Sequence, residues 1–196
     1  MKTRIATINR ETTETDISVT VNLDGTGKYQ VETGIGFLNH MLELFSKHSL
    51  IDLTVKAKGD LKIDEHHTVE DIGICLGEAL RKAVGDKKGI ERYGFLLPMD
   101  EALAEVAIDL GGRSLLVWNV TFKREKIGDM PTELFEDFFK AIADNLQANI
   151  HINVKYGRNE HHIAESVFKS FARAMRFAVS RDKRAKDLLP FTKGKL

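Results

Sequence analysis

The sequence predicts an α+β fold of two similar half-domains, each with the element order β-β-α-β-α, whose helix layers pack between two small mixed sheets. A repeated motif is the first indication: Glu-His-His at 65–67 is followed by Glu70, and Glu-His-His at 160–162 is followed by Glu165. The segments around both motifs show the same order of alternating and helical patterns, which indicates duplication. Each half exposes one apolar helical layer, and two such layers are best buried against each other.

The first half is predicted to span about residues 4–94. Apolar residues alternate with polar ones between 17 and 23, which is typical of a half-buried strand. Asp-Gly-Thr-Gly at 24–27 predicts a hairpin turn. The predicted elements are strands at 17–23 and 29–33, a helix at about 37–48, a strand at 52–58, and a helix from 64 or 65 to about 85.

The second half, about 95–187, repeats this order and ends in a short basic tail. Gly-Gly-Arg at 111–113 predicts a turn between two strands. Pro131 is a common first residue of a helix, and Asn159 is a suitable helix cap. The predicted elements are strands at 104–110 and 115–122, a helix at about 131–146, a strand at 150–156, and a helix capped at 159 and ending near 180. We expect the whole chain, 1–196, to form a single domain.

The composition excludes broad classes of partner. The chain has 29 Lys and Arg against 29 Asp and Glu, so its formal net charge is zero, which argues against a general affinity for nucleic acid or an anionic membrane. No segment approaches the ~18 apolar residues of a membrane-spanning helix, and the first ten residues do not resemble a secretory signal. We therefore expect a cytoplasmic protein. The single cysteine, Cys75, lies on an apolar helical stripe and is predicted to be buried.

The histidine motifs predict two metal sites. Residues four apart lie on one face of a helix, so His66 with Glu70, and His161 with Glu165, each offer an imidazole and a carboxylate to one ion. The second histidine of each motif points about 100° away and is free to reach another ion. We therefore predict that the two copies exchange ligands. The His-Glu-x-x-His order of thermolysin-type proteases is absent, so a metalloprotease is disfavoured.

The repeat alignment nominates the remaining ligands, because His40 and Asp137 hold equivalent places in the first helix of each half. The predicted first site consists of His40, His67, His161 and Glu165, and the predicted second site of His66, Glu70, His162 and Asp137. Imidazole and carboxylate ligands without thiolate suit Mn²⁺, Fe²⁺ or Zn²⁺. The sequence does not choose among these ions.

Eight stretches together resemble one known family. They are residues 10–15 (RETTET), 22–27 (NLDGTG), 34–42 (GIGFLNHML), 64–71 (DEHHTVED), 92–94 (RYG), 98–102 (PMDEA), 111–113 (GGR) and 157–169 (GRNEHHIAESVFK). On these motifs the chain resembles the imidazoleglycerol-phosphate dehydratases of histidine biosynthesis over nearly its whole length. The resemblance implies two Mn²⁺ ions per subunit, a small-molecule phosphate substrate whose imidazole lies between them, and a homo-oligomeric shell of 24 subunits with metal sites formed between subunits.

The resemblance also bears on residues outside the histidine motifs. Glu14 is similar to the substrate-contacting glutamate of the family and is the first candidate for the acid/base shuttle, with His48 and Asp100 as further candidates. The candidates for binding substrate phosphate are Arg92, Arg113, Lys169, Thr192 and Lys193. His151 alternates within a predicted strand and is left out of the site.

Two positions depart from the family pattern. The family commonly has His or Glu where this chain has Asp137, which is a shorter donor. Near the C-terminus the family has Ser-Ser-Lys or Ser-Thr-Lys, whereas this chain has Phe191-Thr192-Lys193. Phe191 offers no hydroxyl, so a phosphate contact is either missing here or made by Thr192.

The implied reaction, a dehydration, is difficult without the metal ions that these residues are predicted to bind. Hydroxide is a poor leaving group, and the C–H proton lost beside it is barely acidic. Two metal ions on the ring nitrogens would stabilise an imidazolate, whose electrons expel the hydroxyl to give a diazafulvene-like intermediate. Two other functions remain open: a dinuclear hydrolase acting on a phosphate ester, and a metal-dependent structural shell that only stores ions.

Overall fold

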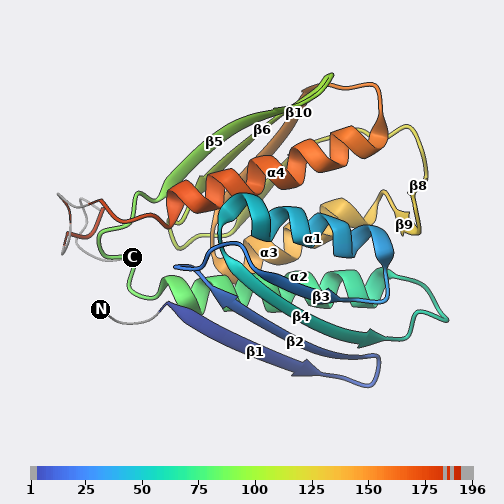
Figure 1. The fold of residues 1–196 in the computed structure, drawn as a ribbon, viewed down its shortest axis with the longest axis horizontal. Coiled ribbons are helices and arrows are strands. Elements are labelled where there is room, and N and C mark those ends of the chain that lie inside the picture. The colour runs from blue at the N-terminus through green and yellow to red at the C-terminus, as the bar shows by residue number, and fades with distance from the viewer. Residues whose placement is uncertain (1–3, 183–184, 186–187, 191–196) are drawn as a thin grey trace.

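The structure, a computed structural model, describes residues 4–182, 185 and 188–190. Within these residues two four-stranded sheets enclose a layer of four helices (Figure 1). The helices are α1 (Gly36–Ser49), α2 (His66–Val84), α3 (Leu134–Leu146) and α4 (Glu160–Ala178). The strands are β1 (Ile5–Glu11), β2 (Thr15–Asn22), β3 (Tyr29–Glu32), β4 (Asp52–Gly59), β5 (Tyr93–Met99), β6 (Ala102–Asp109), β7 (Leu115–Asn119), β8 (Lys126–Ile127), β9 (Met130–Pro131) and β10 (Asn149–Tyr156).

Both large sheets have the same topology. The first has the strand order β1-β2-β4-β3 and the second has the order β5-β6-β10-β7. In each sheet the first three strands are antiparallel neighbours, and the last strand is parallel to the one beside it. The predicted α+β class, with helices between two small mixed sheets, is therefore confirmed. The shared order is the one expected of duplicated halves, and β5 begins the second sheet close to the predicted division at 94 and 95.

Each half contains a first strand that the sequence did not predict, β1 in one and β5 in the other. β1 is an edge strand with a weak pattern: Ile5 is 54% exposed, and Asn9 and Glu11 are polar. It is held by pairing with β2, from Ile5 opposite Asn22 to Glu11 opposite Asp16. A strand that is stabilised mainly by its neighbour carries little local signal. The large elements thus follow the order β-β-β-α-β-α in each half.

The predicted hairpin at 24–27 is wrong, because β2 and β3 are not neighbours. β4 lies between them and pairs with both. The turn is held from β4: the Asp52 carboxylate accepts hydrogen bonds from the backbone N–H of Thr26 at 2.8 Å and of Lys28 at 2.9 Å. In the second half β10 likewise separates β6 from β7, around the turn at 111–113. The glycine signals identified the turns but not which strands would pair.

The two helices of the second half differ in how well their starts were predicted. Pro131 lies in β9 rather than at a helix start, and α3 begins at Leu134. The Thr132 hydroxyl donates to carbonyl oxygens of the preceding loop, so contacts to that loop fix this segment. The predicted cap of α4 is confirmed, because Asn159 Oδ1 accepts a hydrogen bond from the backbone N–H of His161 at 3.0 Å.

The helices pair across the two halves. α1 packs against α4, and α2 packs against α3, as the layer in Figure 1 shows. Phe45 of α1 stacks on Phe171 of α4 with 5.5 Å between ring centroids. Cys75 of α2 is fully buried, as predicted, and burial raises the pKa of its thiol to about 12. A thiol in this state is neutral and packs as a small apolar group.

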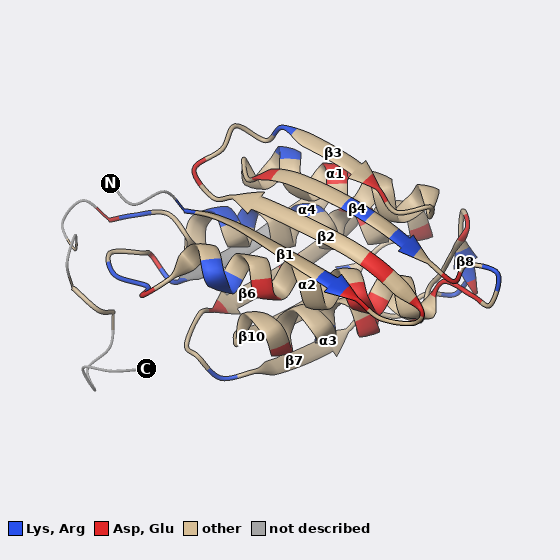
Figure 2. Cartoon of the chain, turned by 90° about the horizontal axis from the view of Figure 1, so that it is seen from below, with Lys and Arg blue, Asp and Glu red and all other residues tan. Residues whose placement is uncertain are grey.

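Charges of both signs cover the outside of the molecule. Figure 2 shows Lys and Arg as well as Asp and Glu on the elements seen from the side of the first sheet. This agrees with the zero net charge of the sequence. Among the described residues, none of the helices combines the length and the apolar character needed to cross a membrane.

Two glycines allow α2 and α3 to approach closely, and this contact can be tested. A Cβ added at Gly77 would lie 2.9 Å from the Ile142 carbonyl oxygen, and one added at Gly73 would lie 2.8 Å from that of Phe138. Gly77→Val should therefore destabilise the fold by about 1–3 kcal/mol through overpacking, although valine is the better helix former. Chemical denaturation measures this, with Lys82→Val on the exposed side of α2 as the control. Equal stability of the two variants would contradict the close contact.

Candidate metal centre

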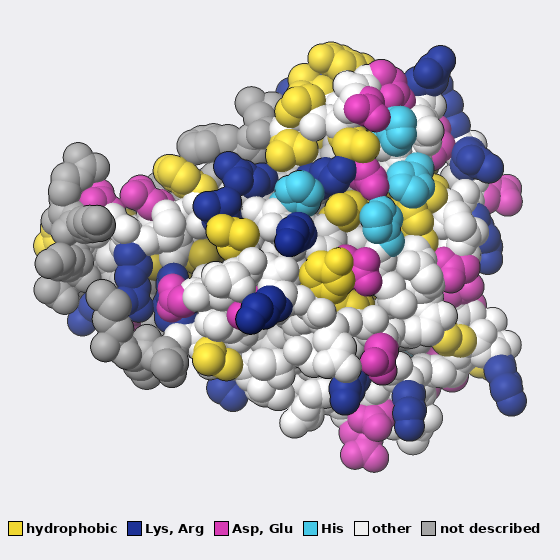
Figure 3. All heavy atoms as spheres, in the orientation of Figure 1, with side chains coloured by type: hydrophobic (Ala, Val, Ile, Leu, Met, Phe, Trp, Pro, Cys, Tyr) yellow, Lys and Arg dark blue, Asp and Glu magenta, His cyan; other side chains and the backbone are white. Residues whose placement is uncertain are grey.

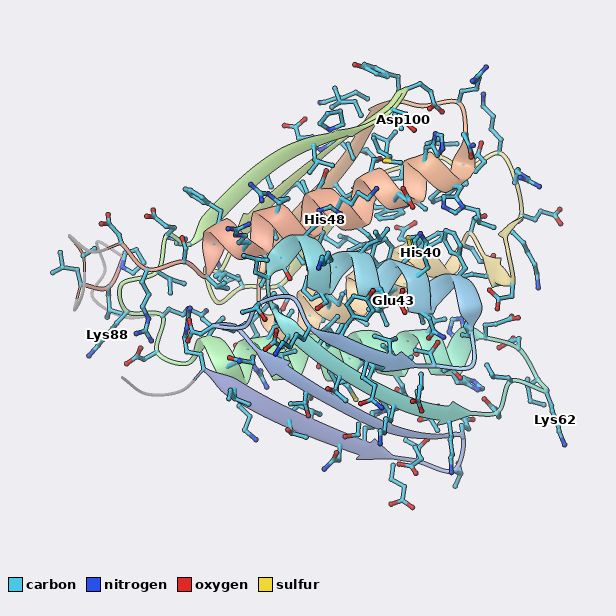
Figure 4. All side chains as sticks on the ribbon, viewed as in Figure 1. His40, Glu43, His48, Lys62, Lys88 and Asp100 are labelled. Atoms are coloured by element: carbon cyan, nitrogen blue, oxygen red, sulfur yellow. The ribbon has the colours of Figure 1, made fainter. Side chains whose placement is uncertain are left out.

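One cluster of candidate ligands lies where α1 meets the start of α4. His40 Nε2 is 2.9 Å from Glu165 Oε1, and His161 Nε2 is 3.3 Å from the same oxygen. One donor atom from each of these residues lies within 4.8 Å of the other two. Phe37 packs edge-on against the His161 ring, with 5.3 Å between centroids. Figure 4 shows His40 on the side of α1 that faces α4.

Glu165 is the charged group at the centre of this cluster, and only 7% of it is exposed. Burial raises the pKa of its carboxyl, but hydrogen bonds from Lys169, His40 and His161 outweigh burial and lower the pKa to about 2. Lys169 Nζ donates to Glu165 Oε2 at 2.8 Å. Glu165 is therefore an anion at neutral pH, which is the form that binds a metal ion.

A second, more open cluster lies where α3 meets α2. Asp137 Oδ2 is 3.9 Å from His66 Nδ1, and both side chains are almost half exposed. Glu70 is exposed and lies one turn after His66 on the same helix. α3 thus brings Asp137 to the first histidine motif, as α1 brings His40 to the second. Each cluster combines residues from both halves of the chain.

His67 does not join the predicted site with His161 within a single chain. Its Nδ1 lies 3.0 Å from Asp60 Oδ2 and 3.8 Å from Glu14 Oε2. The hydrogen bond to Asp60 raises the pKa of His67. Glu14, the first candidate for the acid/base shuttle, is exposed in the turn between β1 and β2. The structure therefore places Glu14 beside the second histidine of the first motif.

His162 has the equivalent surroundings in the second half. Its Nδ1 lies 2.8 Å from Glu101 Oε2 and 3.9 Å from Asp100 Oδ2, both in the turn between β5 and β6. The hydrogen bond raises the pKa of His162 and lowers that of Glu101 to about 2. Asp100, another predicted acid/base group, lies at the tip of this hairpin (Figure 4). Like His67, His162 lies outside the α1–α4 and α2–α3 clusters. His67 itself forms a separate group of possible metal ligands with Glu14 and Asp60.

Asp60 and Glu101 are not among the site residues that the sequence predicts. Glu101 lies within the PMDEA stretch, and its neighbour Asp100 was selected instead. Asp60 directly follows Gly59 and precedes the first histidine motif by a few residues. No helical spacing links Asp60 to a histidine, because it lies outside the helix on which His67 stands. The sequence therefore offered one weak signal, which is that Glu101 stands next to the predicted residue Asp100.

His48 lies near the first cluster but does not belong to it. Figure 4 shows it at the other end of α1 from His40, again facing α4. Burial lowers its pKa, and the positive charges of Lys169 and Arg173 lower it further. Figure 3 shows this arrangement as histidines gathered over α1 and the start of α4, with Lys and Arg beside them. His48 is therefore a neutral imidazole near pH 7, as a proton shuttle requires.

Those predicted phosphate-binding residues that the structure describes are divided between two ends of the molecule. Lys169 lies at the first cluster, through its bond to Glu165. Arg92 lies beyond the C-terminus of α4, where its backbone N–H donates to Ala178 and its guanidinium pairs with Asp109. His161 and Ala178 are separated by roughly 25 Å at the rise of an α-helix.

Arg113 does not lie at either cluster. Arg113 is exposed in the turn between β6 and β7, where its carbonyl oxygen accepts from Asn149. Thr192 and Lys193 lie outside the described residues, as does Phe191. His151 is exposed on β10 and stands apart from the clusters, in accordance with its omission from the predicted site.

The donor atoms fit a divalent transition-metal ion. Both clusters offer imidazole nitrogens and carboxylate oxygens, and Cys75 is buried in the core away from them. This mixture suits Mn²⁺, Fe²⁺ or Zn²⁺. Fold and clusters together define a duplicated α+β protein with donor sets of metal-ligand type at the junction of its halves.

Comparison with known proteins gives the family. The model of the family described as imidazoleglycerol-phosphate dehydratase matches residues 33–175. A protein of that name from Granulibacter bethesdensis is 56% identical over 195 residues, which cover 99% of this chain and 100% of that protein. The chain belongs to the imidazoleglycerol-phosphate dehydratase family, whose members are lyases.

Other matches agree in fold and sequence. The histidine biosynthesis bifunctional protein HisB of Spirosoma linguale is 57% identical over 98% of this chain, which corresponds to 50% of that protein. The crystal structure of the Staphylococcus aureus dehydratase has a TM-score of 0.82 and 40% identity, covering 91% of this chain and 99% of that one. The Pyrococcus furiosus structure, solved in complex with (S)-C348, has a TM-score of 0.81 and 35% identity, covering 96% and 100%.

The geometry of the first cluster predicts that His40 and Glu165 serve the same ion. His40→Ala and Glu165→Gln should each deplete one metal position and leave the other filled, because each removes a donor from the same group of three. Anomalous scattering from crystals soaked in Mn²⁺ locates the lost ion. His151→Ala, an exposed histidine on β10, is the control and should keep both ions. Depletion of different positions by the two variants would contradict the cluster.

Proposed function

We propose that this chain dehydrates D-erythro-imidazoleglycerol phosphate to imidazole acetol phosphate in histidine biosynthesis, at a centre that holds two divalent metal ions. The observation that carries the proposal is the pair of imidazole and carboxylate clusters at α1–α4 and α2–α3, in a chain of this family. Mn²⁺ is the proposed ion, and other divalent transition metals fit the same donors. A cytoplasmic location stays a prediction.

The proposed ligands of the two ions come from both motifs and from both first helices. His40, His161 and Glu165 would hold one ion, and His66, Glu70 and Asp137 would hold the other. His67 and His162 are the remaining proposed ligands and would reach ions of neighbouring subunits. When bound, the ions supply Lewis acidity that stabilises negative charge on the imidazole of the substrate.

The acid/base groups of the proposal accompany the second histidine of each motif. Glu14 is 3.8 Å from His67, and Asp100 is 3.9 Å from His162, so each carboxylate would enter a shared site together with its histidine. One group must take the carbon-bound proton, and another must protonate the departing hydroxyl. His48 is a neutral imidazole on the Lys169 side of the first cluster and is a third candidate for these transfers.

The proposed phosphate site also requires more than one subunit. Lys169 is the only predicted phosphate ligand in the described part of the chain that lies at a metal cluster, whereas Arg92 and Arg113 lie near the opposite end. A substrate bound at the cluster of one subunit would meet Arg92 and Arg113 of another. This division supports the homo-oligomeric shell of 24 subunits that the family resemblance implies.

One assay distinguishes the proposed dehydratase from the two other functions, a hydrolase and a structural shell. Purified protein loaded with Mn²⁺ should convert imidazoleglycerol phosphate to the ketone product. A dinuclear hydrolase acting on the same compound would instead release inorganic phosphate. A structural shell would bind the metal and leave the substrate unchanged. Phosphate release without ketone, or no turnover by the metal-loaded protein, would refute the dehydratase proposal.

The proposed phosphate role of Arg113 predicts a selective loss of affinity. Arg113→Ala should weaken substrate binding roughly ten- to a hundred-fold, since a hydrogen bond to a charged group contributes about 1.5–3 kcal/mol. Arg113 is a cleaner test than Arg92, whose pairing with Asp109 makes it part of the folded structure. An imidazole analogue without phosphate should bind the variant as it binds the parent. Equal loss for both ligands, or a similar loss in Lys56→Ala on the outside of the first sheet, would contradict the assignment.

The proposed metal sites between subunits predict that assembly depends on the ion. An ion that binds only the assembled form stabilises it by about 4 kcal/mol per site at a thousand-fold excess over Kd. Exhaustive chelation, or protonation of ligand histidines below their ordinary pKa of about 6.5, should therefore split the particle into smaller symmetric pieces. Added Mn²⁺ should restore it, as followed by light scattering. A particle mass that is insensitive to both treatments would show that the ions do not join subunits.

A further inference from the structure

We propose that Asp60 and Glu101 are positioning residues that hold His67 and His162 in the orientation and tautomer in which Nε2 binds a metal ion. The inference rests on the proposed function, because it takes the two histidines as metal ligands. It adds two carboxylates that act through the histidines.

The contacts at the two rings are alike. Asp60 approaches His67 at Nδ1, with its carboxylate oxygens at 3.0 and 3.3 Å. Glu101 approaches His162 at Nδ1, with Oε2 at 2.8 Å. An ionised carboxylate only accepts hydrogen bonds, so the proton of a neutral ring must be on Nδ1 and the lone pair on Nε2. Among the described residues, neither Nε2 has a hydrogen-bond partner.

Glu101 is itself held in place by the start of α4. Its Oε1 accepts from the backbone N–H of Asn159 at 2.8 Å and of Arg158 at 3.3 Å. This leaves Oε2 directed at His162. The hairpin of β5 and β6 is thereby tied to the helix that carries the motif, and the ring is fixed relative to both.

The two halves form the same bond from different elements, and duplication alone does not explain this. Asp60 follows the last residue of β4, whereas Glu101 stands in the turn between β5 and β6. The residue at the place of Asp60 in the second half is Arg158, which follows Gly157 as Asp60 follows Gly59. The shared feature is therefore a carboxylate on Nδ1 of the second histidine. This is the partner that metal-binding histidines characteristically have, and its removal typically weakens metal affinity 10–100-fold.

Isosteric variants of the full-length protein test the role. In Glu101→Gln the amide oxygen can still accept from the start of α4. The amide NH₂ would then face Nδ1, where it cannot accept the hydrogen bond that the ring N–H donates. Asp60→Asn removes the charge at the other ring. Each variant should bind Mn²⁺ about ten- to a hundred-fold more weakly, as measured by competition with a chelating dye. Asp16→Asn on β2 and Glu105→Gln on β6 remove exposed or half-exposed carboxylates that do not contact a histidine, and they should retain the parental affinity.

Double variants separate positioning from a general effect. If Asp60 acts through His67, Asp60→Asn should weaken Mn²⁺ binding no further in a His67→Ala background, and Glu101→Gln should add nothing to His162→Ala. Two results would overturn the proposal. One is parental Mn²⁺ affinity in both Asp60→Asn and Glu101→Gln. The other is that each carboxylate change weakens Mn²⁺ binding as much in the His67→Ala or His162→Ala background as it does in the parent protein.

The failure of the proposed function has a different signature. If His67→Ala and His162→Ala bound Mn²⁺ with parental affinity, both the ligand assignment and the positioning role would be refuted. Positioning would be supported if Asp60→Asn weakened Mn²⁺ binding in the parent protein but not in the His67→Ala background. This result does not depend on which compound the parent protein turns over.

Discussion

The pairing of helices across the two halves is the constraint on which the rest of the structure depends. α1 of the first half packs on α4 of the second, and α3 of the second packs on α2 of the first. Gly73 and Gly77 set the distance between α2 and α3, and the stacked rings of Phe45 and Phe171 join α1 to α4. Neither half can bury its helices alone, so the halves form one core.

The same pairing builds the candidate metal centre. His40 belongs to the first half and meets His161 and Glu165 only because α1 lies on α4. Asp137 approaches His66 by the equivalent contact between α3 and α2. The ligand clusters therefore lie at the interface between the two half-domains. Rigid helices position their donors more accurately than loops do, which suits a site that must hold ions at fixed places.

Because the chain has no net charge, ions are attracted by individual charged groups and not by an overall electrostatic field. Positive and negative residues balance, so anions and cations must be attracted by particular groups. Glu165 shows how this is achieved: burial opposes its charge, and three hydrogen-bonding neighbours restore it. Lys169 contributes to that balance and also lowers the pKa of His48. The same cation thus favours the ionised form of Glu165 and, together with burial, the neutral form of the nearby His48.

The sequence by itself determined the features that follow from local periodicity. Apolar spacing located the four long helices, and the four-residue spacing of His161 and Glu165 placed both on one face of α4. Equivalence in the repeat selected His40 and Asp137, and both lie beside the motifs. Asn159 was recognised as a cap because capping depends on its immediate neighbours.

Only the tertiary structure decided what depends on contacts between distant segments. Three features arise from such contacts: the insertion of β4 between β2 and β3, the pairing of β1 with β2, and the position of Pro131 in the short strand β9. The surroundings of His67 and His162 are of the same kind, because Asp60 and Glu101 reach these rings from a loop and a hairpin turn. A helical spacing fixes which residues share a face, but the neighbours across that face are set by the packing of other elements.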